Sequence, residues 1–259
     1  MNVWRPLSPG WQERVRTFAR HSESVVAISW LPSGEGFVSA GIDKALYLWG
    51  DGGRVVEAWH GTRVADMAVH HHGSHIIAAS ERGLTLCQIS PEAASRPRGA
   101  LRGAYALLAA DGEAYNTHAS ARGRDPPDTH HAFPTDLYVE ESVPVTALTL
   151  SRDSHYALVS TASHEVHLWD LRARALVQRY EGHKQGRLVL RTCFGGADES
   201  FVISGSEDSQ VFVWHRHSAA LVTALPGHSG AVNAVAWNPA ACMFASASDD
   251  HTVRLWAPP

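Results

Sequence analysis

Cysteine is scarce in this sequence, and its few copies lie far apart. The 259 residues hold three, Cys87, Cys193 and Cys242, and none of them has the CxxC spacing of a zinc or redox motif. Neither a disulfide framework nor a cysteine-ligated metal is therefore expected. The N-terminus lacks the apolar segment of a signal peptide, and no apolar run approaches the ~18 residues of a membrane span. We expect a soluble protein of the cytoplasm, the nucleus or both.

Charge is also low, and its balance is acidic. Charged residues make up 19% of the chain, against a usual ~25%, and 22 Lys and Arg face 26 Asp and Glu, for a net charge of −4. A protein that holds nucleic acid or an anionic membrane would favour a basic surface, so neither is expected as a partner. Glycine (21), proline (13) and tryptophan (9) are plentiful, which is typical of short strands joined by tight turns.

The sequence contains an internal repeat that ends in tryptophan. Three segments open with histidine and close with tryptophan: residues 21–49, 183–214 and 228–256. The tryptophans at 169, 214 and 256 are 45 and 42 residues apart. This spacing matches the ~40–45-residue period of a WD-repeat propeller blade. We predict an all-β WD-repeat β-propeller with about five recognisable four-stranded blades.

Two more polar positions recur inside these three segments. A serine lies ten residues, and an aspartate six residues, before the tryptophan. The buried indole N–H needs an acceptor, the serine can pass a hydrogen bond on to the imidazole, and the carboxylate can take the other imidazole N–H. A catalytic triad should occur once, whereas this set occurs three times, so we predict a structural network and no catalytic residue. Its members are His21, Ser39, Asp43, Trp49, His183, Ser204, Asp208, Trp214, His228, Ser246, Asp250 and Trp256.

Two further units keep only part of the pattern. Residues 63–89 have strand-like alternation but end in Ile89, where tryptophan is expected. Residues 143–171 keep Trp169 but carry Ser163 at the aspartate position. We expect these two blades to close by apolar packing rather than through the polar network.

These units divide the chain into consecutive segments. Blades are predicted at residues 21–60, 61–89 (degenerate), 143–182, 183–227 and 228–259. Residues 90–142, rich in Ala, Arg, Gly and Pro, are interpreted as a low-complexity loop insertion. Residues 1–20 are interpreted as the end of a preceding blade or as the strand that closes the last blade, because the last unit has three strands and no fourth. We expect part of a seven-bladed ring; the alternative is a small closed ring in which residues 90–142 supply extra strands.

The C-terminal half also resembles one particular family. The stretches VHLWDLRARALVQRYEGHKQG from Val166 and CFGGADESFVISGSEDSQVFVWHR from Cys193 are similar to the WD-repeat subunit of the GID/CTLH ubiquitin ligase complex, as are the last blade and residues 59–64. The resemblance covers most of residues 21–89 and 143–259 and implies the last five blades of that subunit. The family carries LisH and CTLH helical segments ahead of its propeller, and we expect no counterpart of them in this sequence.

The resemblance implies a non-catalytic scaffold in an E3 ubiquitin ligase that acts in proteasome-dependent degradation, with ligase subunits and substrate proteins as partners. Recruitment would use the loops at the ends of the propeller. In WD-repeat propellers the residue before the network aspartate faces the entrance of the ring, which points to Ile42, Glu207 and Asp249. Two of these are acidic and would suit a basic partner segment.

Other functions remain open at this stage. Trp169-Asp170-Leu171-Arg172 resembles the box by which some propellers dock on the adaptor of cullin-RING ligases, through Asp170 and Arg172; a generic WD-repeat scaffold is a further alternative. A propeller hydrolase is less favoured, because the histidines of residues 70–75 lack a completing ligand set and no GxSxG, HExxH or P-loop motif is present. We expect no metal, cofactor or small-molecule substrate.

Overall fold

The computed structural model describes residues 1–8, 11–50, 53–90, 129–132 and 138–257, and for residues 2–16 and 129–132 it describes the backbone alone. In this part of the chain the regular structure is almost entirely β-strand, and a short 3-10 helix lies at Ala197–Glu199. The predicted all-β class is therefore confirmed. Most of residues 90–142, the predicted loop insertion, lie outside the described residues.

Five successive sheets, each of neighbouring antiparallel strands, carry most of the chain. The first contains β3 (Val25–Trp30), β4 (Phe37–Gly41), β5 (Ala45–Trp49) and β6 (Val55–His60), and the second contains β7 (Asp66–Val69), β8 (His75–Ser80) and β9 (Gly83–Gln88). The third contains β12 (Val145–Leu150), β13 (Tyr156–Thr161), β14 (Val166–Asp170) and β15 (Ala175–Tyr180). The fourth contains β16 (Thr192–Gly195), β17 (Phe201–Gly205), β18 (Gln210–His215) and β19 (Leu221–Pro226), and the fifth contains β20 (Val232–Asn238), β21 (Met243–Ser248) and β22 (Val253–Trp256).

Two short strands fall inside the segment interpreted as a loop. β11 (Val139–Glu140) pairs antiparallel with β9 and is the fourth strand of the second sheet, while β10 (Thr129–Ala132) pairs in parallel with β6. Gly83 makes the β9–β11 pairing possible: its φ is +141°, and a Cβ there would lie 2.1 Å from the carbonyl oxygen of Val139. Only glycine tolerates both conditions. The second sheet thus takes its outer strand from the C-terminal end of the segment interpreted as an insertion.

The N-terminal residues form a sheet of their own. β1 (Asn2–Ser8) and β2 (Trp11–Thr17) make an antiparallel hairpin. The ring of Phe18, directly after it, packs edge-on against Phe37 and Trp49 of the first sheet, with centroids 5.0 and 5.2 Å apart. In the structure β2 pairs with β1, and the fifth sheet has three strands. The closing of the last blade by residues 1–20 therefore stays a prediction.

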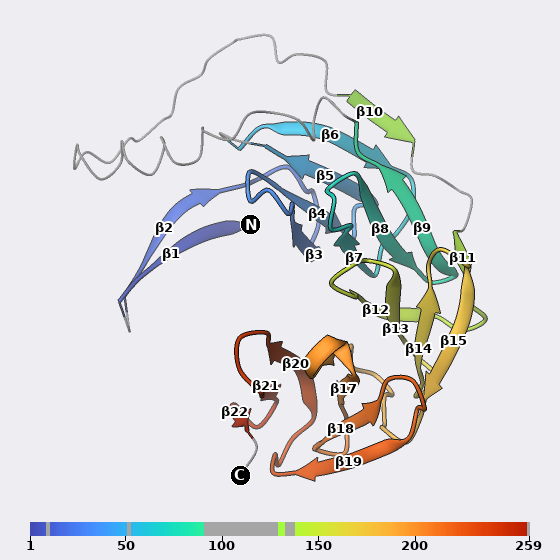
Figure 1. The fold of residues 1–259 in the computed structure, drawn as a ribbon. Helices are drawn as coiled ribbons and strands as arrows, with labels where there is room; N and C mark the ends of the chain where they lie inside the picture. Colours follow the sequence, from blue (N-terminus) through green and yellow to red (C-terminus); the bar gives the residue numbers. More distant parts are fainter. Residues whose placement is uncertain (9–10, 51–52, 91–128, 133–137, 258–259) are drawn as a thin grey trace.

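The five sheets follow one another around an arc, as Figure 1 shows. The first strand of each sheet lies on the inner side of the arc, and these inner strands contact their neighbours in the order β3, β7, β12, β16 and β20. The outer strands β6, β15 and β19 lie at the periphery. This is the radial arrangement of propeller blades.

The core lies between successive sheets, so a sheet with a neighbour on both faces contributes to two apolar clusters. In β8, Ile76 packs toward the first sheet and Ile77 toward the third. In β17, Val202 packs toward the third sheet and Ile203 toward the fifth. Successive side chains of a strand point to opposite faces, so a sheet buried on both faces is apolar at consecutive positions. This explains the continuous apolar runs of the middle strands.

Candidate protein-interaction face

Two of the predicted networks are present in full. In the first sheet, the indole N–H of Trp49 donates to Ser39 Oγ (2.8 Å), Ser39 Oγ lies 2.8 Å from His21 Nε2, and His21 Nδ1 lies 2.9 Å from Asp43 Oδ1. Every donor has an acceptor if the serine hydroxyl donates to Nε2 and Nδ1–H donates to the carboxylate. The network therefore fixes the loop before β3 against β4 and β5.

The fifth sheet repeats this chain of bonds. Trp256 Nε1 donates to Ser246 Oγ (2.8 Å), which lies 2.7 Å from His228 Nε2, and His228 Nδ1 lies 2.8 Å from Asp250 Oδ2. The Thr252 hydroxyl donates to the same carboxylate (2.6 Å), and this bond, followed by that of His228, lowers the pKa of Asp250 although desolvation opposes it. The carboxylate therefore stays charged to strongly acidic pH.

The bonds expected among His183, Ser204, Asp208 and Trp214 in the fourth sheet are not made. The Ser204 hydroxyl donates to the carbonyl oxygen of Gly205, and the Trp214 indole donates to that of Glu181. His183 is 2% exposed, yet neither ring nitrogen has a hydrogen-bond partner. Burial lowers its pKa to about 4, with Gln185 and Asp208 opposing the shift. The imidazole is therefore neutral at physiological pH.

A different residue takes over this role in the fourth sheet. The unit beginning at His183 is three residues longer than the other two complete units, and the extra length forms a loop after the histidine. One carboxylate oxygen of Glu207 accepts the backbone N–H groups of Gly186 (2.8 Å), Arg187 (2.8 Å) and Leu188 (2.9 Å). Glu207 thus holds the loop that the tetrad was expected to hold.

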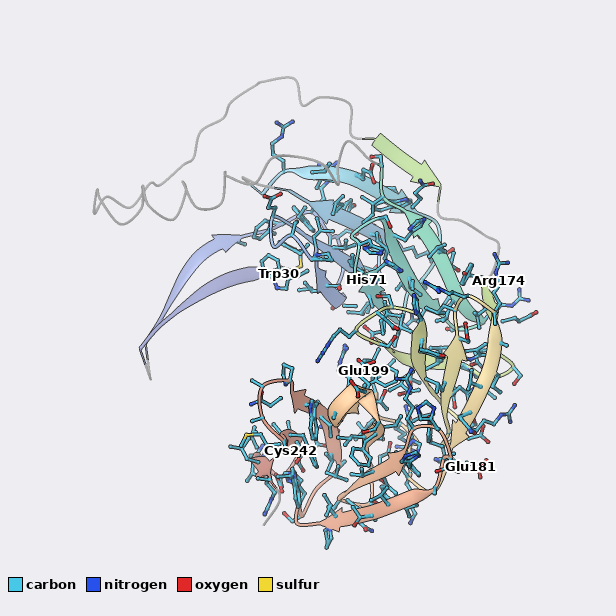
Figure 2. The ribbon with its side chains drawn as sticks, viewed as in Figure 1. Trp30, His71, Arg174, Glu181, Glu199 and Cys242 are labelled. Carbon is cyan, nitrogen blue, oxygen red and sulfur yellow. The ribbon has the colours of Figure 1, made fainter. Side chains whose placement is uncertain are left out.

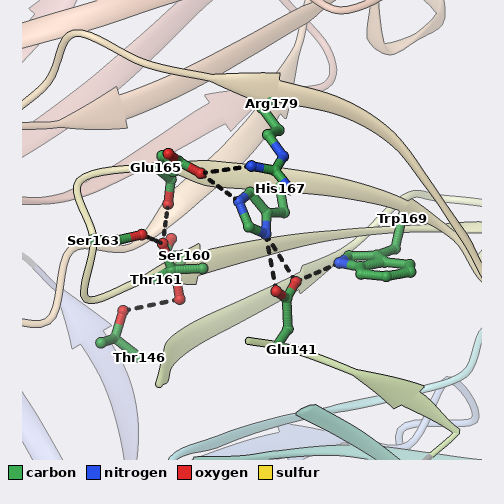
Figure 3. Close-up of polar contacts among 9 residues, drawn as sticks. All are labelled: Glu141, Thr146, Ser160, Thr161, Ser163, Glu165, His167, Trp169 and Arg179. Atoms are coloured by element: carbon green, nitrogen blue, oxygen red, sulfur yellow. Dashed lines mark hydrogen bonds and ion pairs between the residues drawn. The ribbon is translucent and has the colours of Figure 1, made fainter. Parts of the chain in front are cut away.

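The third sheet is closed by a network that the sequence did not predict. Figure 3 shows Glu141 between His167 and Trp169: one carboxylate oxygen lies 2.9 Å from His167 Nδ1 and also accepts the Trp169 indole N–H. His167 Nε2 lies 2.7 Å from Glu165. The expectation that this blade closes by packing alone is therefore wrong. Burial acts to lower the pKa of His167, but its bonds to Glu141 and Glu165 outweigh burial and raise it.

A sequence signal for Glu141 does exist. Glu141 lies 28 residues before Trp169, and His21 and His228 lie 28 residues before their tryptophans. Glutamate therefore stands at the position of the opening histidine, and a histidine two residues before the tryptophan supplies the imidazole. In the second sheet, by contrast, Ile89 is 2% exposed and packs in the apolar cluster shared with the first sheet. That blade has no tryptophan to satisfy.

The inner strands are also connected by a buried acid that the sequence did not single out. Asp66, at the start of β7, accepts the backbone N–H of Leu148 on β12 (3.0 Å) and pairs with Arg191 just before β16 (3.1 Å). The Arg191 N–H in turn donates to the carbonyl oxygen of Asn233 on β20. One acid and one arginine thus connect four successive sheets.

The opposite ends of the sheets carry their own contacts. There the turns between the first two strands of the second and third sheets each touch the following sheet: His71 N–H donates to Ser154 Oγ (3.0 Å), and Arg152 N–H donates to Glu199 (2.8 Å). Figure 2 shows His71 and Glu199 on the inner side of the arc. The two ends of the sheets therefore differ. The end that carries the polar networks and Glu207, in the loops before the first strand and between the second and third strands, is here called the network end.

The residues predicted to bind partners have different environments. At the network end, Ile42 and Glu207 are half-buried and Asp249 is exposed. An oxygen of Asp249 accepts the side-chain N–H of Asn233. At the opposite end, Asp170 accepts the backbone N–H groups of Arg172 and Ala173, while the Arg172 side chain is exposed.

Within the described ranges, no cluster of three or more His, Cys, Asp or Glu side chains has the arrangement of a metal site. The same part of the chain also contains no helix with the length and apolar character required to span a membrane.

Comparison with known proteins agrees with this geometry. Residues 12–50, 174–215 and 219–257 match the WD domain, G-beta repeat family. Together with the radial sheets and the repeated histidine–serine–tryptophan bonds, the match shows that the chain contains WD repeats folded as propeller blades.

More specific relatives are longer proteins. The WD repeat-containing protein 26 homolog of Arabidopsis thaliana is 33% identical over 93% of this chain and 35% of its own length. GID complex subunit 7 of Schizosaccharomyces pombe is 32% identical over 95% of this chain and 42% of its own length. The WD repeat-containing protein WDS homolog of Arabidopsis thaliana is 32% identical over 99% of this chain and 51% of its own length. The chain thus spans between about a third and a half of these relatives.

Proposed function

We propose that the chain is a non-catalytic protein-interaction scaffold in a GID/CTLH-type E3 ubiquitin ligase, acting in protein degradation in the cytoplasm, the nucleus or both. The similarity to GID complex subunit 7 over 95% of the chain supports the assignment to such a complex. Its partners would be ligase subunits and substrate proteins.

The observation that carries the scaffold proposal is where the polar networks lie. His21 and His228 each form hydrogen bonds with a serine and an aspartate of their own sheet. The first chain of bonds ends at the buried Trp49 and the second at the half-buried Trp256. Such repeated bonds fix loops to strands. They leave the exposed loops free to differ in sequence, which is how rigid scaffolds present binding residues.

Affinity purification of the tagged chain from its own cells tests this proposal. We expect RING-bearing ligase subunits to be recovered with the chain and absent when an unrelated tagged protein is used. Recovery of no ligase subunit, together with a hydrolase activity that is lost when His70 and His72 are replaced, would overturn it.

A second candidate is docking on a cullin-RING adaptor through Trp169–Arg172. The exposed side chain of Arg172 favours it, although Asp170 is engaged in its own turn. An Arg172→Ala variant should lose binding to the adaptor while its thermal unfolding is unchanged. Equal adaptor binding by the variant and the natural chain would exclude this mode.

A further inference from the structure

The loop at Lys184–Arg191, here called the basic loop, is held in one conformation although it lies on the surface. Glu207 accepts three successive N–H groups in its middle, at Gly186, Arg187 and Leu188. Three N–H groups converging on one carboxylate oxygen form a nest that fixes the backbone. The N–H groups of Leu188 and Gly186 are the main causes that lower the pKa of Glu207, so its charge persists at physiological pH.

Both ends of the basic loop are anchored as well. The buried side chain of Gln185 donates to Thr146 Oγ1 (2.7 Å), and its backbone N–H donates to His164 Nδ1 (2.9 Å). At the other end Leu190 is fully buried, and Arg191 pairs with Asp66. The residues between these anchors therefore have little freedom to lose when a partner binds.

The side chains that this fixed backbone presents are apolar and cationic. Leu188 and Val189 are 37% and 51% exposed. Lys184 and Arg187 are exposed, and neither forms an ion pair within the part of the chain that the structure describes. Glu207, the acid beside them, already directs an oxygen into the loop. Although the chain is acidic overall, the loop presents two positive charges, at Lys184 and Arg187, close to the exposed apolar pair that follows them in the sequence.

We propose that the basic loop binds a short acidic segment of a partner protein, with an apolar side chain of that segment packed against Leu188 and Val189. Carboxylates near that side chain would pair with Lys184 and Arg187. Charge complementarity of this kind directs association, while the apolar contact at the centre supplies most of the affinity. This inference rests on the proposed function as an interaction scaffold and specifies the chemistry of one partner.

Glu207 acts in this proposal as a positioning residue. It was expected to attract a basic partner directly, but its carboxylate oxygen faces the loop backbone instead. Replacing it with alanine leaves three N–H groups without their acceptor and frees the loop. Glu207→Ala should therefore weaken binding without removing any contacting side chain.

A displayed library of random peptides, selected on the full 259-residue chain, tests the proposal. The enriched peptides should carry Asp or Glu close to a large apolar residue. Binding of one labelled enriched peptide is then measured by fluorescence anisotropy. We expect Val189→Asp and Arg187→Glu each to raise the Kd at least tenfold, which is about 1.4 kcal/mol, and Glu207→Ala to raise it severalfold.

Val222→Asp is the matched control, because Val222 on β19 is 55% exposed and lies away from the loop in sequence. It should leave the Kd unchanged, and circular dichroism should show all four variants folded. Enrichment of basic or unbiased peptides would refute the proposal, as would equal affinity of Val189→Asp and Val222→Asp. These outcomes are independent of the purification experiment. If ligase subunits are recovered but no acidic peptide binds the basic loop, only the role of the loop is overturned. If acidic peptides bind but no ligase subunit is recovered, only the ligase assignment is overturned.

Discussion

The buried carboxylate of Glu141 should be among the most sensitive positions of the third sheet. Its side chain is 3% exposed and accepts hydrogen bonds from both His167 and Trp169. Glu141→Ala leaves two donors without their acceptor, the buried imidazole of His167 and the half-buried indole of Trp169. Removing one partner of a buried pair costs about 3–5 kcal/mol. Glu141→Gln keeps an acceptor oxygen but loses the charge, so we expect a smaller loss of about 1–3 kcal/mol.

Urea unfolding followed by tryptophan fluorescence measures both losses. The matched control is Glu140→Ala: this neighbouring side chain is 73% exposed, and its oxygen lies 3.8 Å from Arg82. An exposed pair of that kind contributes ~0–1 kcal/mol. If Glu141→Ala and Glu140→Ala lower the free energy of unfolding equally, the third-sheet network has no energetic role and the reasoning is refuted.

The same network predicts how stability depends on pH. The folded pKa of His167 is raised above its unfolded value of ~6.5. The protonated imidazole therefore stabilises the folded state fully below pH ~6.5, and this contribution is lost as the pH rises through the folded pKa. In urea titrations, the free energy of unfolding should decline less with rising pH for Glu141→Gln than for the natural chain. The reason is that Glu141 contributes part of the raised pKa of His167.

Two other positions give separate predictions. The folded pKa of His183, about 4, lies below the unfolded ~6.5, so the free energy of unfolding should fall by up to about 3 kcal/mol as the pH drops through this window. His183→Leu should largely remove that fall in urea titrations; a pH dependence identical to that of the natural chain would contradict the neutral, buried imidazole. Gly83→Ala should cost about 1–3 kcal/mol, because it strains the backbone and displaces β11. Gly34→Ala is the control, at φ +73° with nothing within 4 Å of the added Cβ, and should cost less, about 1 kcal/mol. Urea unfolding measures both losses, and equal losses would show that β11 does not depend on Gly83.

The fold could be predicted from the sequence because its signals are periodic. The spacing of tryptophans, and of serine and aspartate before them, predicted the all-β class and the bonds around His21 and His228. β11 could not be predicted in this way, since a strand of two residues near the end of the predicted insertion carries no periodicity. Its place depends on the space that Gly83 leaves at the edge of β9.

The candidate site was harder to predict than the fold. A matching residue type does not guarantee a matching bond: His183 has the expected neighbours in sequence, but Glu207 holds the longer loop and the imidazole remains unpaired. Conversely, Glu141 carries out a histidine's role with a different chemical group. Asp66 and Arg191 lie 125 residues apart, and only the stacking of the inner strands brings them together.

The Asp66–Arg191 pair connects the end of the basic loop to distant sheets. It fastens the end of the basic loop to the second sheet, while the neighbouring N–H of Arg191 fastens the same point to the fifth. Any change in the curvature of the arc would therefore displace that end of the loop. A partner that changed this curvature by binding to a distant sheet would therefore alter the affinity of the basic loop for the acidic segment proposed above, without contacting the loop.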